Sequence, residues 1–122
     1  MARHKSIGTT TIANGASLSS AFSLGDKQLV GLIISAAWTA ADLTFQASED
    51  GGTTWLNVFD QAGVELKIAT AGVVAGQRVS LDPTPFIGID MIKIRSGTNA
   101  APVAQGAART LTVISRKIYP LT

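Results

Sequence analysis

Short runs in which hydrophobic and polar residues alternate recur along this chain, and the clearest lies in residues 43–59. From Leu43 to Ser48 every second residue is apolar, and this period of two predicts a half-buried strand. Residues 49–52 then break the pattern with Glu-Asp-Gly-Gly, which favours a tight turn, and residues 53–59 are again good strand formers. The stretch therefore predicts a β-hairpin.

Turn signals separate the remaining runs from one another. Asn14-Gly15 is a strong signal for a two-residue hairpin turn. Pro83 and Pro85 end a strand, because a proline cannot donate to a β-ladder. Further strands are expected at 7–13, 17–24, 28–36, 64–68, 79–81, 86–95 and 107–118.

Alternation within these runs also predicts which side chains face the core. In residues 86–95, Ile92 and Ile94 are expected to point inward, and Lys93 and Arg95 outward. About eight short strands without a helical pattern indicate an all-β fold. We expect a two-sheet, jelly-roll-like sandwich, because the Cys-Trp-Cys core of immunoglobulin domains is absent.

Length and composition indicate one domain with a short arm. The chain has 122 residues, of which 46% are apolar and 15% charged, a balance that excludes intrinsic disorder. Residues 7–122 are expected to form a single β-sandwich domain, and residues 1–6 a flexible N-terminal arm. In the arm, Arg3, His4 and Lys5 are candidates for contact with a partner; a frayed terminus without a function is the alternative.

Residue types that carry catalysis or bind cofactors are scarce. The chain has no cysteine, its one histidine is His4, and its acidic residues are scattered, so we expect no enzymatic activity, no metal and no cofactor. No apolar signal-peptide region follows the basic start, and the apolar run 29–38 is about half the length that spans a bilayer, so no membrane partner is expected. Basic residues are not interleaved with aromatic ones, which argues against nucleic-acid binding.

Charge is unevenly distributed along the chain, although the formal net charge is only +2. Residues 28–66 contain five acidic residues and no lysine or arginine, whereas residues 67–122 contain seven basic residues and two acidic ones. Such asymmetry suits docking against a charged partner. An uneven but solvated surface is the alternative interpretation.

The predicted hairpin also contains a known local motif. The spacing Ser48-x-Asp50-x-Gly52-x-x-Trp55 resembles the Asp-box of sialidases and of many unrelated β proteins. It has two interpretations, a self-stabilised turn or part of a glycan-active enzyme. We favour the structural turn, because sialidases repeat the box around a large propeller and this chain has one copy. Gly52 is then expected to adopt a backbone conformation that is costly for other residues, and Trp55 to be largely buried.

Several short phrases follow one another in a characteristic order: LVGL at 29–32, AWT at 37–39, LTFQAS at 43–48 followed by Asp50-Gly51, IKIRSGT at 92–98 and RTL at 109–111. In the order of these phrases, the chain resembles a group of small virion structural proteins of tailed bacteriophages. The resemblance covers roughly residues 22–117. It implies a non-enzymatic protein of the phage head, such as a decoration (cement) or head-spike component.

On this basis the expected function is that of a capsid decoration protein. It would form a homotrimer, bind the major capsid protein and stabilise the head, and it would reach the capsid surface of the virion after assembly in the host cytoplasm. A component of the tail, baseplate or fibre is one alternative. A carbohydrate-binding β-sandwich module is another, suggested by Trp38, Trp55 and the Asp-box.

Overall fold

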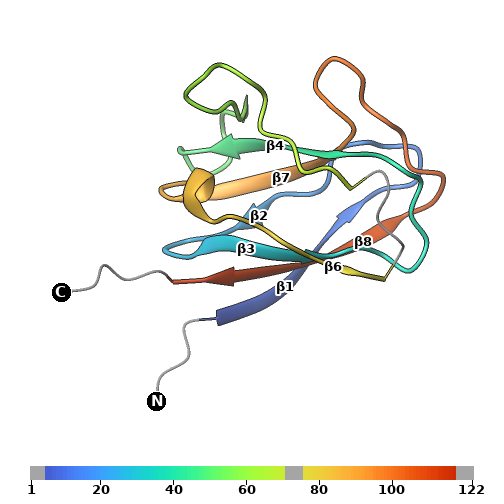
Figure 1. The fold of residues 1–122 in the computed structure, drawn as a ribbon, viewed down its shortest axis with the longest axis horizontal. Coiled ribbons are helices and arrows are strands. Elements are labelled where there is room, and N and C mark those ends of the chain that lie inside the picture. Colours follow the sequence, from blue (N-terminus) through green and yellow to red (C-terminus); the bar gives the residue numbers. More distant parts are fainter. Residues whose placement is uncertain (1–4, 71–75, 118–122) are drawn as a thin grey trace.

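The computed structural model describes residues 5–70 and 76–117. Within them, eight strands form two four-stranded antiparallel sheets that pack face to face (Figure 1). The elements are β1 (Lys5–Ile12), β2 (Phe22–Ser23), β3 (Gln28–Ile33), β4 (Leu43–Ser48), β5 (Leu56–Asn57), β6 (Arg78–Ser80), the 3-10 helix η1 (Thr84–Phe86), β7 (Met91–Ser96) and β8 (Arg109–Arg116).

The strand order is that of a jelly roll. One sheet has the order β1-β8-β3-β6 and the other the order β2-β7-β4-β5. Every connection except β4–β5 passes from one sheet to the other. The first four strands therefore pair with the last four in reverse order: β1 with β8, β2 with β7, β3 with β6 and β4 with β5. Two antiparallel sheets wound in this way form a jelly-roll sandwich. The predicted fold class is thereby confirmed.

The hydrophobic core lies between the two sheets. Phe45 from β4 meets Phe86 from η1 edge to face, with ring centroids 5.1 Å apart. The inward positions predicted by alternation are confirmed, since Ile92 and Ile94 are fully buried. Alternation therefore identifies the core face of β7 correctly.

The Asn14-Gly15 turn forms, but it does not join two strands of one sheet. Gly15 has φ +79°, as a tight turn requires. Beyond the turn, Ile12 pairs with Ser19 only through an isolated bridge. The amide of Ser19 donates instead to the carbonyl of Ile94, at 2.8 Å, and this bond draws the chain across to the sheet of β7. The prediction of a simple hairpin was therefore wrong.

Several predicted strands are shorter than their sequence patterns. The second arm of the 43–59 hairpin is reduced to β5, and residues 86–95 divide into the end of η1, a turn and β7. Residues 64–68 form no continuous strand; isolated bridges join Phe59 to Glu65 and Leu43 to Ile68. Ile68 exchanges two backbone hydrogen bonds with Leu43 of β4, and the amide of Leu66 donates to the carbonyl of Val58, so the segment pairs only at separate points.

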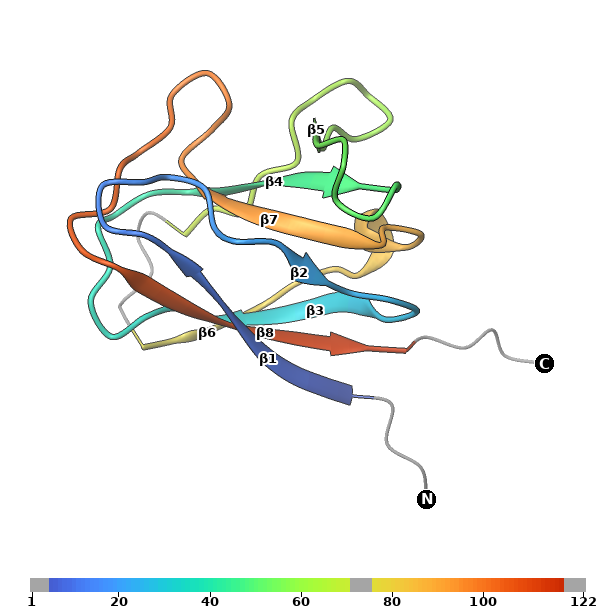
Figure 2. The ribbon, with the colours of Figure 1, turned by 180° about the vertical axis from the view of Figure 1, so that it is seen from behind.

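Lys5 and Ser6, predicted to belong to a flexible arm, are part of a strand. They are the first residues of β1, where they pair with Arg116 and Ser115 of β8. The described ends of the chain therefore lie side by side at one end of the sandwich (Figure 2). Arg3 and His4 lie outside the described residues.

Candidate functional site

The Asp-box turn after β4 is closed by its own hydrogen bonds. Ser48 Oγ donates to Asp50 Oδ1 at 2.9 Å and accepts the amide of Gly52 at 2.9 Å. Asp50 Oδ1 also accepts the amides of Thr53 and Thr54, at 3.1 Å and 2.8 Å. Each short polar side chain thus satisfies backbone donors of its own turn, as Ser and Asp do in such positions.

These bonds determine the charge state of Asp50. The backbone amide of Thr54, followed by the Thr54 and Ser48 side chains, lowers the pKa of Asp50 to about 2. The carboxylate is therefore ionised near neutral pH, and its Oδ1 is engaged as an acceptor. A group in this state is poorly suited to act as a general acid, which requires a pKa near the working pH.

Gly52 and Trp55 complete the turn. Gly52 has φ +94°, which confirms the expected conformation. Trp55 Nε1 donates to the carbonyl of Gly52 at 2.9 Å. The ring is partly buried, and it does not belong to the hydrophobic core between the sheets. The ring packs near the side chains of β7 that point away from the core: the ammonium of Lys93 lies 4.6 Å from its centroid.

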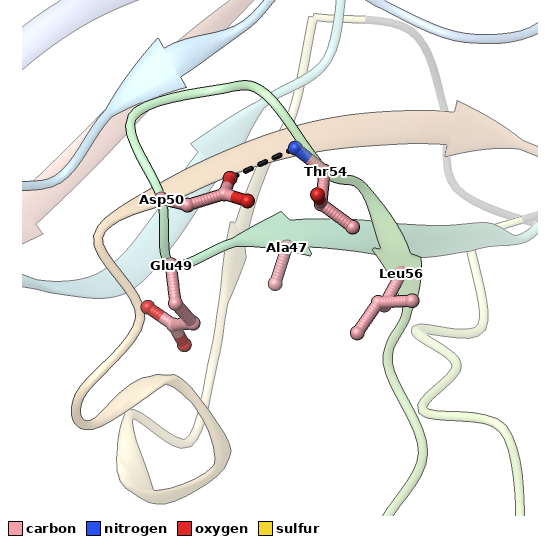
Figure 3. Close-up of a pocket in the computed structure, with 5 residues that line it drawn as sticks. All are labelled: Ala47, Glu49, Asp50, Thr54 and Leu56. Carbon is pink, nitrogen blue, oxygen red and sulfur yellow. Dashed lines mark hydrogen bonds between the residues drawn. The ribbon is translucent and has the colours of Figure 1, made fainter.

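A shallow pocket of about 210 Å³ lies beside this turn (Figure 3). Its lining is Ala47, Glu49, Asp50, Thr54 and Leu56. Glu49 Oε1 accepts the amide of Asp90 at 3.1 Å, so both acidic side chains of the lining already serve backbone groups. Pockets for small molecules are typically about 300–1,000 Å³ and rich in aromatic side chains. This pocket is smaller, and neither tryptophan lines it.

The two tryptophans occupy opposite ends of β4. Trp38 precedes the start of the strand and Trp55 follows its end. Trp38 packs against the hydrophobic core, as a core-capping residue does, and its buried Nε1 has no hydrogen-bond partner within the described residues. The pair therefore does not form one aromatic platform for a sugar.

Arg95 is the residue whose environment the sequence pattern misses. It lies opposite Thr44 on the face of the sheet away from the core, in the predicted direction, but it is only 6% exposed. Its guanidinium donates to Asn57 Oδ1 at 2.7 Å, to Glu65 Oε2 at 3.3 Å and to Thr44 Oγ1 at 3.3 Å. Arg95 thus points outward as predicted, but it is buried, because residues 56–68, here called the covering segment, lie over it.

The uneven charge distribution is partly neutralised by folding. Glu65 from the acidic stretch pairs with Arg95 at 3.3 Å, and Asp42 approaches Lys67 Nζ to 3.7 Å. An acidic stretch that lacks its own cations is thus a signal for ion pairs with the basic second half. That signal could have pointed to the burial of Arg95.

The covering segment also carries exposed apolar side chains. Leu56 is 67% exposed, Phe59 51% and Val64 60%. The isolated bridge from Phe59 to Glu65 brings Phe59 close to Val64 in space. Two further large apolar side chains are exposed elsewhere, Ile7 on β1 and Ile87 after η1.

The described residues also bear on metal binding and on membrane spanning. Residues 5–70 and 76–117 include no group of three or more His, Cys, Asp or Glu side chains placed to hold a metal ion. No helix in this part of the chain has the length and apolar character needed to cross a membrane.

The sequence matches no protein-family model, and no curated protein matches it. Among solved structures, the chain is similar to the Yersinia pseudotuberculosis-derived mitogen, with 12% identity and a TM-score of 0.41 over 99% of this chain and 92% of that chain. A likeness of this size carries no argument about function, and the jelly-roll assignment rests on the strand order.

Proposed function

We propose that this protein is a non-enzymatic structural component of a phage virion, a head decoration (cement) protein that binds the major capsid protein and stabilises the head. The proposal rests on the resemblance of residues 22–117 to small virion proteins. It is supported by one feature of the surface, the exposed apolar side chains of the covering segment.

That feature suits a lasting contact with another protein. Leu56, Phe59 and Val64 expose more than half of their side-chain surface within one short segment. Exposed apolar side chains that lie together, as Phe59 and Val64 do through the Phe59–Glu65 bridge, commonly mark protein–protein contacts, and an aromatic anchor often contributes most of the binding free energy. Phe59 is the aromatic member of this group.

The covering segment is also held in a fixed shape before any partner binds. Asp60 Oδ1 accepts the amides of Ala62 and Val64, at 2.9 Å and 3.0 Å, and the Asp60 amide donates to the Val64 carbonyl at 2.8 Å. Beneath it, Arg95 ties Glu65 to β7. A surface ordered in advance loses less conformational entropy on binding.

Binding to heads is the direct test. Undecorated, expanded heads of the phage that encodes the protein are incubated with it and sedimented, and the bound fraction is measured over a concentration series. We expect saturable binding to heads. The variant Leu56→Ser/Phe59→Ser should bind at least tenfold more weakly, while Ile87→Ser, which alters an equally exposed apolar residue after η1, should bind normally.

Each other outcome is decisive. Binding to purified tails and not to heads contradicts decoration and favours the tail, baseplate or fibre alternative. Binding to neither contradicts the virion assignment. If Leu56→Ser/Phe59→Ser and Ile87→Ser lose head binding equally, the covering segment has no specific role in that binding.

A further inference from the structure

The two sheets have four edge strands, and one of them is unlike the others. β1 has eight residues, whereas β6 has three and β2 and β5 have two each. Short edge strands offer few free backbone groups, and a long one is a template for pairing with another chain. Association with another chain is therefore expected at the edge of β1.

Hydrogen bonds at the end of β1 identify which backbone groups face this edge. The carbonyl of Thr11 accepts the amide of Ser20 at 3.0 Å, so the backbone groups of Thr11 point away from β8. The direction alternates along an antiparallel strand, so the N–H and C=O groups of Lys5, Ile7 and Thr9 point the same way. No hydrogen bond joins these edge groups to any residue in the part of the chain that the structure describes.

Only part of the edge is open. Ser19 and Ser20 close its far end, where Thr10 Oγ1 donates to the Ser20 carbonyl at 2.7 Å and Ile12 bridges to Ser19. The free part is the stretch from Lys5 to Thr9. Its middle residue, Ile7, has a side chain that is 64% exposed.

We propose that this open edge pairs with the same edge of a second copy of the chain, antiparallel and centred on Ile7. In this register Ile7 faces Ile7 of the second copy, and Lys5 faces Thr9 of the second copy. Lys5, Ile7 and Thr9 of each copy then each donate and accept one bond, so the contact contains about six backbone hydrogen bonds. The edge is self-complementary because these residues lie symmetrically about Ile7.

Side chains favour the same register. Ile7 lies beside Ile114 of β8. Pairing of two copies therefore places Ile114 and Ile7 of one copy in a single apolar row with Ile7 and Ile114 of the other, and it covers the exposed Ile7. The only charged residue of the open edge, Lys5, meets a threonine rather than a second lysine, so no like charges face each other. The second copy thus matches the edge in hydrogen bonding, apolar contact and charge.

The product is a two-fold dimer in which the β1-β8-β3-β6 sheets join into one continuous sheet. Such a contact is isologous and closes on itself. It is a dimer rather than the trimer that the resemblance implies, and it does not depend on binding to heads. Because strand pairing alone falls below the about 1,200 Å² of a standard interface, association should depend on concentration.

Sedimentation equilibrium of the full chain without a terminal tag tests this. We expect the average mass to rise from one to two chain masses over a concentration series. Ile7→Lys sets two ammonium groups opposite each other on the axis and should weaken dimerisation at least tenfold. Thr110→Lys, which adds the same charge to an exposed residue of β8 away from the edge, should leave it unchanged.

Amide hydrogen exchange supplies a second readout that requires no variant. On raising the concentration, the amides of Ile7 and Thr9 should become at least tenfold better protected, while those of Ser6 and Gly8, which face β8, stay as they are. A strict monomer at high concentration, a trimer, or a dimer that both Ile7→Lys and Thr110→Lys leave intact overturns the proposal.

Discussion

The outer faces of the two sheets, those turned away from the core, differ in what covers them. On β7 and β4 the covering segment lies over Arg95 and Thr44, and both residues are buried. On β1 and β8, Thr9 is exposed and Thr112 partly so. Figures 1 and 2 show residues 56–68 beyond β4, whereas no described segment lies beyond β1 and β8.

The two faces differ in whether their side chains need hydrogen-bond partners from elsewhere in the chain. The covered face contains the guanidinium of Arg95, which donates to Asn57 and Glu65, two residues that lie far from it along the chain. The bare face of β1 and β8 is made largely of threonine and isoleucine, which need no charged partner; Thr9 and Ile7 are exposed there, and Ile114 is buried among its neighbours. A residue that points away from the core can therefore still be buried. Whether it is buried depends on whether another segment of the chain packs over it.

The largest expected effect comes from removing the charge beneath the covering segment. Arg95→Ala leaves the Glu65 carboxylate, which is 17% exposed, without its cation, and leaves Asn57 Oδ1 with only the longer bond from Gln46 Nε2, at 3.3 Å. Breaking a buried ion pair in this way typically costs about 3–5 kcal/mol, and we expect the free energy of unfolding to fall by about 3 kcal/mol. Urea unfolding measures it.

Lys93→Ala is the matched control, because Lys93 lies on the same face of β7 and its ammonium contacts the ring of Trp55. It should lose at most about 1 kcal/mol, the usual size of an exposed cation–π contact. Equal losses for the two variants would mean that the covering segment does not depend on Arg95.

Alternation and local turn chemistry explain which parts of the fold were predictable. Ile92 and Ile94 were placed correctly because the two-residue period depends only on the strand itself. The hydrogen bonds of the Ser48–Trp55 turn were likewise foreseeable, since donors and acceptors lie within four residues of one another. Such features are encoded locally.

The features that were missed depend on contacts between distant residues. The burial of Arg95 requires Glu65, thirty positions away. The passage of the chain from β1 to the other sheet requires Ser19 to find β7. Neither partner is indicated by the residues around it, so the pattern of a single strand could not reveal these contacts.

A smaller effect is expected at the start of the covered region. Trp55→Ala removes the hydrogen bond to the Gly52 carbonyl and the contact with Lys93. Because the ring is half-buried outside the core, the two losses together should cost about 1–2 kcal/mol in thermal or urea unfolding. A cost of about 3–5 kcal/mol, that of a core aromatic, would place the ring in the core after all.

Asp50 should make the stability of this same turn depend on pH. Its pKa is about 2 in the folded chain and near 3.8 ordinarily, so the stabilising contribution of its charge is fully present above about pH 4 and is lost as the pH falls toward 2. Asp50→Asn keeps an acceptor oxygen but cannot titrate. Over that window the thermal midpoint of the wild type should fall more steeply than that of Asp50→Asn, and parallel curves would contradict the role of the charge.

The smallest effect is expected on the bare face. The hydroxyl of Thr112 makes no hydrogen bond to the part of the chain that the structure describes, and its neighbours across the ladder are Thr9 and Ile33. Thr112→Val keeps the branched shape that suits a strand, so the free energy of unfolding should change by no more than about 0.5 kcal/mol in urea unfolding. A loss above about 1 kcal/mol would show that the hydroxyl is engaged, and that this face is covered as the other one is. Because Thr112 lies outside the open edge of β1, the result should also be the same at concentrations above and below those at which the chain dimerises.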